Sequence, residues 1–317
     1  MSHNRIKRTM RLGIDVGGTK IEIVALGPGG AELLRQRVPT PRQAYEDVVR
    51  AIRDLVAHTE ATLGARGTVG IALPGAISAK TGLVKNANST VLIGHPMDKD
   101  LAAALGREVR VQNDANCFAL SEASDGAGAG FDVVFGIIAG TGIGGGLCVG
   151  GRVLTGAHSI AGEWGHNPLP SPHLAEELSD PRLCYCGRVN CIETWCSGPA
   201  LAAQYAKRTG RALDGTGIAE AAGQGDLEAA AVLDAFLDRF ARAIATLVDI
   251  VDPDAIVMGG GLSNIGAFYS QLPGRIEKYC FTPESPPRVL KNLHGDSSGV
   301  RGAAWLWREY EAGGLPK

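Results

Sequence analysis

Four of the seven cysteines lie within thirteen consecutive positions, and three of them have a spacing that suits a metal ion. Cys184, Cys186 and Cys191 follow the pattern C-x-C-x₄-C. A tetrahedral zinc ion takes four sulfur or nitrogen ligands, and His166 is the best upstream candidate for the fourth, with Cys196 as the alternative. The simpler interpretation is three buried apolar cysteines. Because C-x-C brings two thiolates to one point, the sequence favours a structural Zn²⁺ site.

Composition limits the partners of the chain. Lys and Arg number 31 and Asp and Glu 33, so the formal net charge of −2 gives no reason to expect nucleic acid or an anionic membrane as partner. A zinc ribbon would need paired C-x₂-C knuckles in a basic segment, and neither is present. No apolar run could span a bilayer, and residues 1–9, before the alternative start Met10, lack the apolar core of a secretory signal. We therefore expect a cytoplasmic protein whose thiols are reduced.

Two glycine-rich turns could hold phosphate groups, because backbone N–H groups can turn inward there as an anion-binding nest. The residues of the first are Gly13, Asp15, Gly17, Gly18, Thr19 and Lys20. Those of the second are Gly140, Thr141, Gly142, Gly144, Gly145 and Gly146. Asp15 could also hold a hydrated Mg²⁺. A single such turn could be a plain hairpin, but the presence of two favours phosphate binding.

The second turn also matches the dinucleotide pattern G-x-G-x-x-G, at positions 140, 142 and 145. That pattern requires a helix directly afterwards. The following residues, GLCVGGRVLTG, read as strand, turn and strand, because each glycine inside a helix costs about 1 kcal/mol. The sequence therefore argues against a nicotinamide-dependent dehydrogenase, and the Walker pattern of P-loop enzymes is absent.

Hydrophobic periodicity predicts the elements that position these residues. The expected strands cover residues 11–16, 20–26, 68–73, 109–112, 133–138 and 255–261. The expected helices cover 42–62, a segment from about 115, 227–251 and about 300–311. Residues 12–27 align without gaps on 135–150, with four identities. Together with a length of 317 residues, this repeat indicates two related α/β domains.

The motifs in this order resemble the ROK family (repressors, open reading frames, kinases) from about Arg11 to Trp307. The motifs are D-x-G-G-T-K at 15–20, N-D-A-N at 113–116, G-T-G-x-G-x-G at 140–146, G-E-x-G-H at 162–166, C-x-C-G-x-x-x-C-x-E at 184–193 and G-G-G at 259–261. Two departures are Asn190, where the family often has glycine, and a longer segment at 168–183.

The resemblance implies a two-domain actin-like (ribonuclease H-like) ATPase and sugar kinase fold with an interdomain cleft. The expected domains are 10–119 with 300–317, and 120–299. The implied protein is an ATP-dependent hexose kinase that uses Mg²⁺ and is commonly a homodimer. Some family members are repressors, but about ten residues before the first strand leave no room for a DNA-binding domain.

The resemblance also assigns roles to residues. Asp114 resembles the catalytic base, although by sequence alone it could equally cap the helix that follows it. The expected sugar ligands are Asn113, Asp114, Glu163, His166 and Glu193. Gly260 and Gly261 resemble the turn on the adenosine side. His166 could bind zinc through one ring nitrogen and a sugar hydroxyl through the other.

For the substrate, KNANST at 85–90 looks most like bacterial fructokinases that also accept mannose. Asn86, Asn88 and the nearby Gly75 would then read the sugar, with phosphate placed on the 6-hydroxyl of D-fructose. An ordinary Asx-rich turn is the competing interpretation of the two asparagines. The alternatives are an N-acetylglucosamine kinase, a glucokinase or, in a different class, a non-catalytic sugar sensor.

Overall fold

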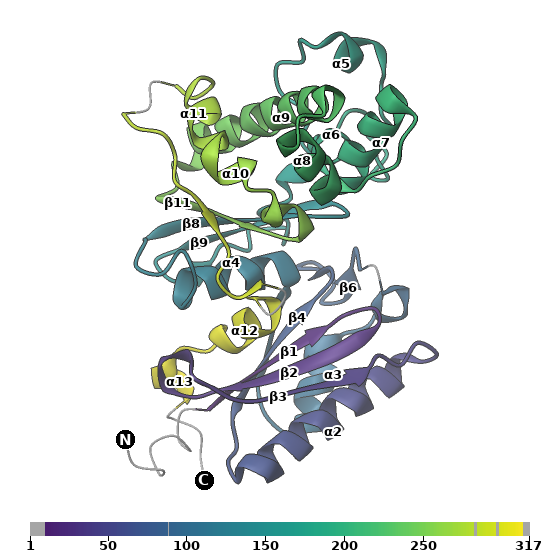
Figure 1. Ribbon diagram of the computed structural model, residues 1–317. Coiled ribbons are helices and arrows are strands. Elements are labelled where there is room, and N and C mark those ends of the chain that lie inside the picture. The colour runs from purple at the N-terminus through teal and green to yellow at the C-terminus, as the bar shows by residue number, and fades with distance from the viewer. Residues whose placement is uncertain (1–9, 88, 282–283, 296–297, 313–317) are drawn as a thin grey trace. The chain divides into compact units, whose positions relative to one another are not determined.

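The computed structural model describes residues 10–87, 89–281, 284–295 and 298–312, and it divides into two compact units (Figure 1). The first consists of Met1–Ala129, Gly151–Ala161 and Asp296–Lys317, and the second of Gly130–Gly150 and Gly162–Gly295. The chain therefore passes between the units four times. A glycine with positive φ lies at every passage: Gly130, Gly150, Gly151, Gly162 and Gly295. The sequence-based boundary at 119/120 divides the chain differently and would cut a continuous helix, α4 (Asp114–Ser124).

The first unit is built on a five-stranded sheet with the order β3-β2-β1-β4-β7. Its strands are β1 (Arg11–Val16), β2 (Lys20–Leu26), β3 (Glu32–Pro39), β4 (Thr68–Leu73) and β7 (Val109–Asn113). β1, β2 and β3 pair antiparallel, whereas β4 pairs parallel with both β1 and β7. The strands predicted at 11–16, 20–26 and 68–73 are confirmed, and the one at 109–112 extends by one residue. Shorter pieces are β5 (Ala76–Ile77), β6 (Val84–Lys85) and β10 (Arg152–Val153).

Helices cover both faces of this sheet. They are α2 (Tyr45–Leu63), α3 (Met97–Leu105), α4, α12 (Ser298–Trp305) and α13 (Glu309–Ala312). α2 and α3 share one apolar core with β1 and β2, while α12 packs on the opposite face. The approach of α12 is so close that a Cβ on Gly13 would lie 2.0 Å from the Val300 carbonyl oxygen, and one on Gly70 1.8 Å from that of Ala303. Glycine is required at both positions because no side chain fits there.

The single helix predicted at about 300–311 is wrong, because the chain turns at 306–308 between α12 and α13. The turn places the Trp307 indole so that its N–H donates to the Val69 carbonyl at 2.7 Å. The Arg110 guanidinium lies 3.8 Å from the centre of the same ring. These tertiary contacts override a helical pattern that the sequence carries through the turn.

The second unit repeats the sheet of the first. Its strands are β8 (Val133–Ala139), β9 (Ile143–Val149), β11 (Ala255–Gly259) and β12 (Val289–Lys291). Together with the short β10 they form a sheet with the order β10-β9-β8-β11-β12. β8 and β9 form an antiparallel hairpin, and β11 pairs parallel with β8 and β12. Order and directions match β2-β1-β4-β7, so the internal repeat is confirmed, as is the α/β class with two ribonuclease H-like sheets. The strand β9 begins at Ile143, inside the 140–146 pattern, where a dinucleotide site would require a helix.

The helices of the second unit surround one long helix, α9 (Leu227–Val251), which begins and ends where the sequence predicted. The others are α5 (Ala175–Ser179), α6 (Ile192–Cys196), α7 (Gly198–Thr209), α8 (Gly215–Gly223), α10 (Ala267–Ser270) and α11 (Leu272–Glu277). Phe236 and Phe240 of α9 are fully buried with Phe268 of α10. In the described ranges, no helix is both long and apolar enough to cross a membrane.

The longer segment at 168–183 contains α5 and is anchored on α9 by buried charges. The Glu177 carboxylate accepts hydrogen bonds from Arg239 at 2.8 Å and from Arg242 at 2.6 Å. Arg242 also donates to the carbonyl oxygens of Pro170 and Ser171, at 2.7 and 3.0 Å. Because a buried charge without its partner is strongly destabilising, these pairs hold the segment in a defined position against α9.

Candidate active site

In the first unit, the predicted phosphate turn lies between β1 and β2. The Gly17 N–H donates to the Lys20 carbonyl at 3.0 Å and closes the turn. Thr40 braces it from the end of β3: its hydroxyl donates to the Gly17 carbonyl at 2.7 Å, and its N–H to that of Thr19 at 3.0 Å. Gly18, Thr19 and Lys20 are exposed. The turn is thus rigid on its inner side and open on its outer side, as an anion site requires.

Two carboxylates come together beside this turn. β1, β4 and β7 are parallel, so Asp15 near the end of β1 and Asp114 just after β7 lie at the same edge of the sheet. Burial, together with the negative charges of Asp114 and Glu22, raises the pKa of Asp15 to about 6. Like charges at one edge of a sheet favour binding of a cation, which makes Asp15 a suitable Mg²⁺ residue.

Asp114 is not the cap of α4, because Asn113 takes that role. The Asn113 side-chain oxygen accepts from the N–H groups of Ala115 and Asn116, at 2.9 and 3.3 Å. Its amide nitrogen donates to Asp114 Oδ1 at 3.0 Å and to the Gly75 carbonyl at 3.1 Å. Asp114 Oδ1 also accepts from the Ala115 N–H at 2.8 Å. The carboxylate is therefore held in one orientation at the positive end of a helix.

The 75–90 region contains the other sugar-binding residues predicted in this unit. Gly75 has φ 132, and a Cβ there would lie 2.6 Å from the Lys85 carbonyl oxygen, so glycine is required where the chain folds over it. Asn86 is exposed with φ 55, a conformation that asparagine tolerates better than most residues. Asn88 lies outside the described residues. The structure thus connects Gly75 directly to Asn113, whereas Asn86 fits the competing interpretation of an Asx-rich turn.

In the second unit, the turn between β8 and β9 consists of Gly140–Gly142, closed by the Gly140 N–H donating to the Gly142 carbonyl at 3.0 Å. Gly260, with φ 76, lies against it, because a Cβ there would be 2.4 Å from the Ala139 carbonyl oxygen. A Cβ on Gly140 would likewise lie 3.7 Å from the Gly261 nitrogen. The turns predicted for phosphate and for adenosine are therefore neighbours at one edge of this sheet.

Gly144, Gly145 and Gly146 lie in β9 and pair with β8 instead of forming the turn. Their lack of side chains lets the segment at 162–166 pack directly on the strand. A Cβ on Gly162 would lie 2.3 Å from the Gly145 carbonyl oxygen, and the Trp164 indole N–H donates to the Gly144 carbonyl at 3.1 Å. These three glycines are thus explained by packing, and Gly140, Thr141 and Gly142 remain the candidates for phosphate contact.

The same packing positions the predicted sugar ligands of this unit. Glu163 is exposed and His166 half-buried on the short 3₁₀ turn Trp164–His166. Glu193 lies in the first turn of α6, and its Oε2 accepts from the Ile143 N–H at 2.9 Å. A Cβ on Gly142 would lie only 2.5 Å from this oxygen. Glu193 is therefore held against the start of β9, next to the phosphate turn.

The four residues predicted to bind zinc converge. The donor atoms of His166, Cys184, Cys186 and Cys191 all lie within 4.8 Å of one another. The His166 Nδ1 is 3.5 Å from the Cys184 sulfur, and the Cys186 and Cys191 sulfurs are 3.6 Å apart. Bond lengths of about 2.3 Å to sulfur and 2.0 Å to nitrogen produce such separations around a tetrahedral ion. The donor set fits Zn²⁺, and Cys196, fully buried on α6, is not part of it.

A short turn positions the sulfurs of Cys184 and Cys186. The Cys184 N–H donates to the Arg188 carbonyl at 2.8 Å, and the Gly187 N–H to the Cys184 carbonyl at 2.9 Å. Asn190 has φ 58, and its side-chain oxygen accepts from the Arg182 N–H at 2.8 Å and the Trp195 indole at 3.3 Å. The departure from the family's usual glycine is thus accommodated, because asparagine adopts the left-handed conformation and adds two hydrogen bonds.

Tyr185 is a site residue that the sequence did not reveal. Its hydroxyl is 3.0 Å from the His166 Nε2, the ring nitrogen that was expected to meet a sugar hydroxyl, and the two rings are perpendicular with centres 5.1 Å apart. Burial raises the pKa of Tyr185, and so do the charges of Glu193 and Glu163. The hydroxyl therefore contacts one of the sugar ligands predicted in this unit, His166. Its place between Cys184 and Cys186, two of the predicted zinc ligands, was the one available signal.

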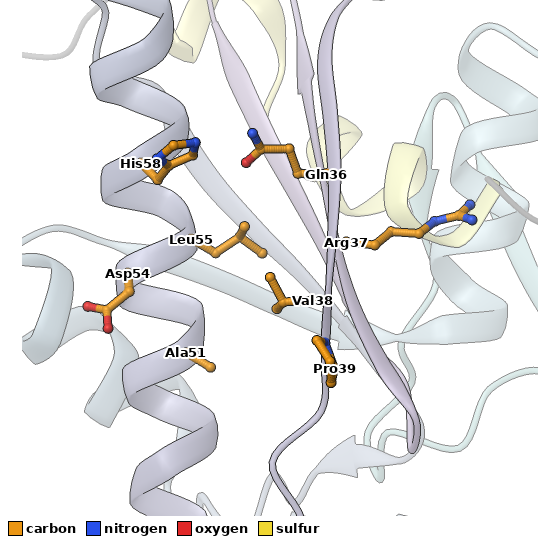
Figure 2. Close-up of a pocket in the computed structure, with 8 residues that line it drawn as sticks. All are labelled: Gln36, Arg37, Val38, Pro39, Ala51, Asp54, Leu55 and His58. Atoms are coloured by element: carbon orange, nitrogen blue, oxygen red, sulfur yellow. The ribbon is translucent and has the colours of Figure 1, made fainter.

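A cavity of about 570 Å³ lies elsewhere in the first unit, between α2 and β3 (Figure 2). Figure 2 shows Leu55 and Val38 facing each other across it, while Arg37 points away from α2. Arg37 pairs with the buried Glu22 at 2.7 Å. No residue predicted for a site lines this cavity, so the candidate active site consists of the loops described above.

Comparisons with known proteins identify the chain's relatives. The ROK family pattern matches residues 11–310. The chain is 41% identical over 299 residues to N-acetyl-D-glucosamine kinase of Escherichia coli (strain K12 / DH10B), covering 94% of this chain and 99% of the relative. It is 30% identical to the ROK hexokinase from Thermus thermophilus, with a TM-score of 0.81 and coverage of 93% and 97%. It is also 30% identical to a ROK family glucokinase from Streptomyces griseus in complex with glucose and AMPPNP, with a TM-score of 0.72 and coverage of 95% and 99%. The chain therefore belongs to the ROK family.

Proposed function

We propose that this chain is an ATP-dependent sugar kinase that phosphorylates the 6-hydroxyl of N-acetyl-D-glucosamine. The observation that carries the proposal is the 41% identity with an N-acetyl-D-glucosamine kinase across nearly the whole of both chains. The relative in complex with glucose and AMPPNP supports ATP as the phosphoryl donor. Fructose, predicted from 85–90, is the less supported substrate, because the relative with 41% identity is an N-acetyl-D-glucosamine kinase.

In the proposed reaction, Asp114 accepts the proton of the sugar hydroxyl as the oxygen attacks the γ-phosphorus. Phosphoryl transfer depends mainly on alignment and charge neutralisation, so the fixed orientation of this carboxylate by Asn113 and Ala115 is the chain's main contribution. Mg²⁺, when held near Asp15, supplies positive charge for the phosphate oxygens. The turns at 17–20 and 140–142 would bind phosphate through backbone N–H groups.

The zinc clip, formed by His166, Cys184, Cys186 and Cys191, has a positioning role in this proposal. His166 is one of the four clustered donors, and Glu193 follows Cys191 by two positions. Glu193 is held by the Ile143 N–H at the start of β9. Zn²⁺, when bound, would fix the imidazole through Nδ1 and leave Nε2 facing the sugar side. We further propose that the enzyme is cytoplasmic and forms a homodimer. Sedimentation of the purified protein tests the oligomeric state.

Substrate preference is tested by comparing kcat/KM over a panel of hexoses. We expect N-acetyl-D-glucosamine to exceed glucose, mannose and fructose by at least about tenfold, because a site built on hydrogen bonds leaves buried polar groups unpaired with a poorly matched sugar. A coupled assay of ADP release at matched ATP gives the ratios. A higher kcat/KM for fructose would restore the fructokinase interpretation, and no ATP turnover with any hexose would favour a non-catalytic sensor.

Tyr185→Phe tests whether the tyrosine competes with the sugar for His166. Removing the hydroxyl leaves Nε2 without the contact seen at 3.0 Å. We expect KM for the sugar to fall about two- to fivefold, because an exposed hydrogen bond contributes about 1 kcal/mol or less, with kcat unchanged. Steady-state kinetics measure this, zinc content serves as the integrity check, and Tyr279→Phe, another exposed tyrosine of this unit, is the control. A raised KM would mean that the hydroxyl itself binds the sugar.

A further inference from the structure

A second cavity, of about 360 Å³, opens in the first unit and is lined by basic side chains. Its wall is formed by β7, α4, β10 and the turn between α12 and α13. Arg110, Arg152, Arg308 and Glu311 supply its charges, so the formal charge of the lining is 3 − 1 = +2. None of the residues assigned to sugar, phosphate or zinc lines it.

Arg110 is a fixed part of this wall. Its guanidinium donates to both Glu311 oxygens, at 2.8 and 3.0 Å, and to the Leu306 carbonyl at 2.7 Å. It also stacks 3.8 Å from the centre of the Trp307 ring. A guanidinium held on both its edge and its face cannot swing out into solvent. Glu311 Oε2 also accepts from the Arg308 backbone N–H at 2.8 Å. This single carboxylate is therefore shared by two arginines, and the lining keeps an excess of positive charge.

Arg152 and Arg308 carry the excess charge. Across the described ranges, neither side chain forms an ion pair with a carboxylate. Two solvated surface arginines would be unremarkable, but these two face one hollow together with a third. Their mutual repulsion is relieved when an anion lies between them. The planar fork of each guanidinium matches two oxygens of a phosphate group.

We propose that this cavity is a binding site for a small molecule that carries a phosphate group, held between Arg152 and Arg308. The volume lies within the range of small-molecule pockets and exceeds what a bare phosphate fills. The apolar side chains of Leu120 and Trp305 in the lining can contact the rest of the ligand. The site does not depend on the proposed kinase activity, since it shares no residue with the candidate active site.

The cavity nevertheless touches the strand that ends at the catalytic candidate. Gln112 of β7 lines it, and the Gln112 side-chain oxygen accepts from the Asn113 N–H at 2.8 Å and from the Asn116 amide at 3.1 Å. The Gln112 amide nitrogen donates to the Thr155 hydroxyl at 2.9 Å. A polar wall whose hydrogen bonds are already made is rigid, which favours a preformed site.

Equilibrium dialysis with radiolabelled inorganic phosphate tests the proposal. Saturating AMPPNP and N-acetyl-D-glucosamine are included so that the candidate active site is already occupied. We expect the full chain to bind one further phosphate. Arg152→Ala/Arg308→Ala should weaken this binding at least tenfold, while Arg42→Ala, an exposed arginine distant in the sequence from the lining, should leave it unchanged. A second dialysis uses a hexose 6-phosphate, and tighter binding than phosphate alone identifies an organic ligand, whereas equal binding identifies free phosphate.

No additional phosphate on the wild-type chain, or equal binding by the double variant, overturns the proposal. Arg152→Lys/Arg308→Lys guards against a folding artefact, because it keeps both charges and loses only the forked geometry. This variant should bind phosphate with an affinity between the wild type and the alanine double variant. Equal thermal unfolding midpoints for all variants would show that the differences in phosphate binding do not arise from unfolding. If the proposed kinase function is wrong, AMPPNP and N-acetyl-D-glucosamine do not occupy the candidate active site. The difference in phosphate binding between the wild type and the arginine variants still tests the proposed cavity site.

Discussion

Replacing Asp114 by asparagine is expected to lower kcat by about 10²–10⁴-fold, the usual contribution of a positioned general base. Asparagine keeps a side-chain oxygen that can accept from the Ala115 N–H, as Asp114 does at 2.8 Å, so α4 should start unchanged. It cannot take the proton of the sugar hydroxyl. The loss should therefore appear in kcat, while the dissociation constant of the sugar, measured by calorimetry, changes little.

The control for this variant is Asp54→Asn, which makes the same chemical change on the exposed surface of α2. Its kcat should match the wild type. Near-normal turnover by the Asp114 variant would remove this residue from the catalytic role. The base would then have to be sought among the other carboxylates of the candidate site.

The variant Cys184→Ser/Cys186→Ser is expected to lose its metal, from one Zn²⁺ per chain to nearly none. Serine is a poor zinc ligand at neutral pH, and two of the four donors that lie within 4.8 Å of one another would be gone. Because His166 then lacks its fixed orientation, kcat/KM for the sugar should fall at least about tenfold. Elemental analysis of the purified protein and steady-state kinetics measure the two effects.

Two other cysteines sharpen this test. Cys280→Ser should keep the metal and the activity, because Cys280 lies outside the cluster. Cys196→Ser distinguishes the two candidate fourth ligands, since Cys196 lies fully buried on α6. Release of the metal by this single change would show that His166 is not the fourth ligand. Full metal content in the Cys184/Cys186 variant would point to other ligands altogether.

Local patterns predicted the parts of the fold that local physics decides. The β1–β2 and β8–β9 hairpins follow from short apolar runs around glycine turns, and α9 from a long apolar stripe that stops before Pro253. The convergence of the predicted zinc ligands follows for the same reason, since C-x-C brings two sulfurs together within one turn of chain. His166 was predicted as a ligand because a tetrahedral zinc ion needs a fourth donor and this histidine lies upstream of the cysteines.

What the sequence could not give depends on contacts between distant segments. The turn at 306–308 is held by Val69 and Arg110, which are some two hundred positions away. The glycines of β9 look like a phosphate loop until the packing of Gly162 on Gly145 explains them. Tyr185 carries no motif of its own. Substrate preference is harder still, because a few hydrogen bonds decide between hexoses that one fold accommodates.

The four passages of the chain between the two units set an order for folding during synthesis. The first unit starts with β1, yet its sheet is covered on one face by α12 (Ser298–Trp305), which leaves the ribosome only after the whole second unit. Until then, the bare backbone at Gly13 and Gly70 faces water where α12 belongs. The second unit, by contrast, is complete once Gly295 has emerged. The unit that is started first is therefore finished last, and a chain truncated before α12 should be captured by chaperones with its first sheet half covered.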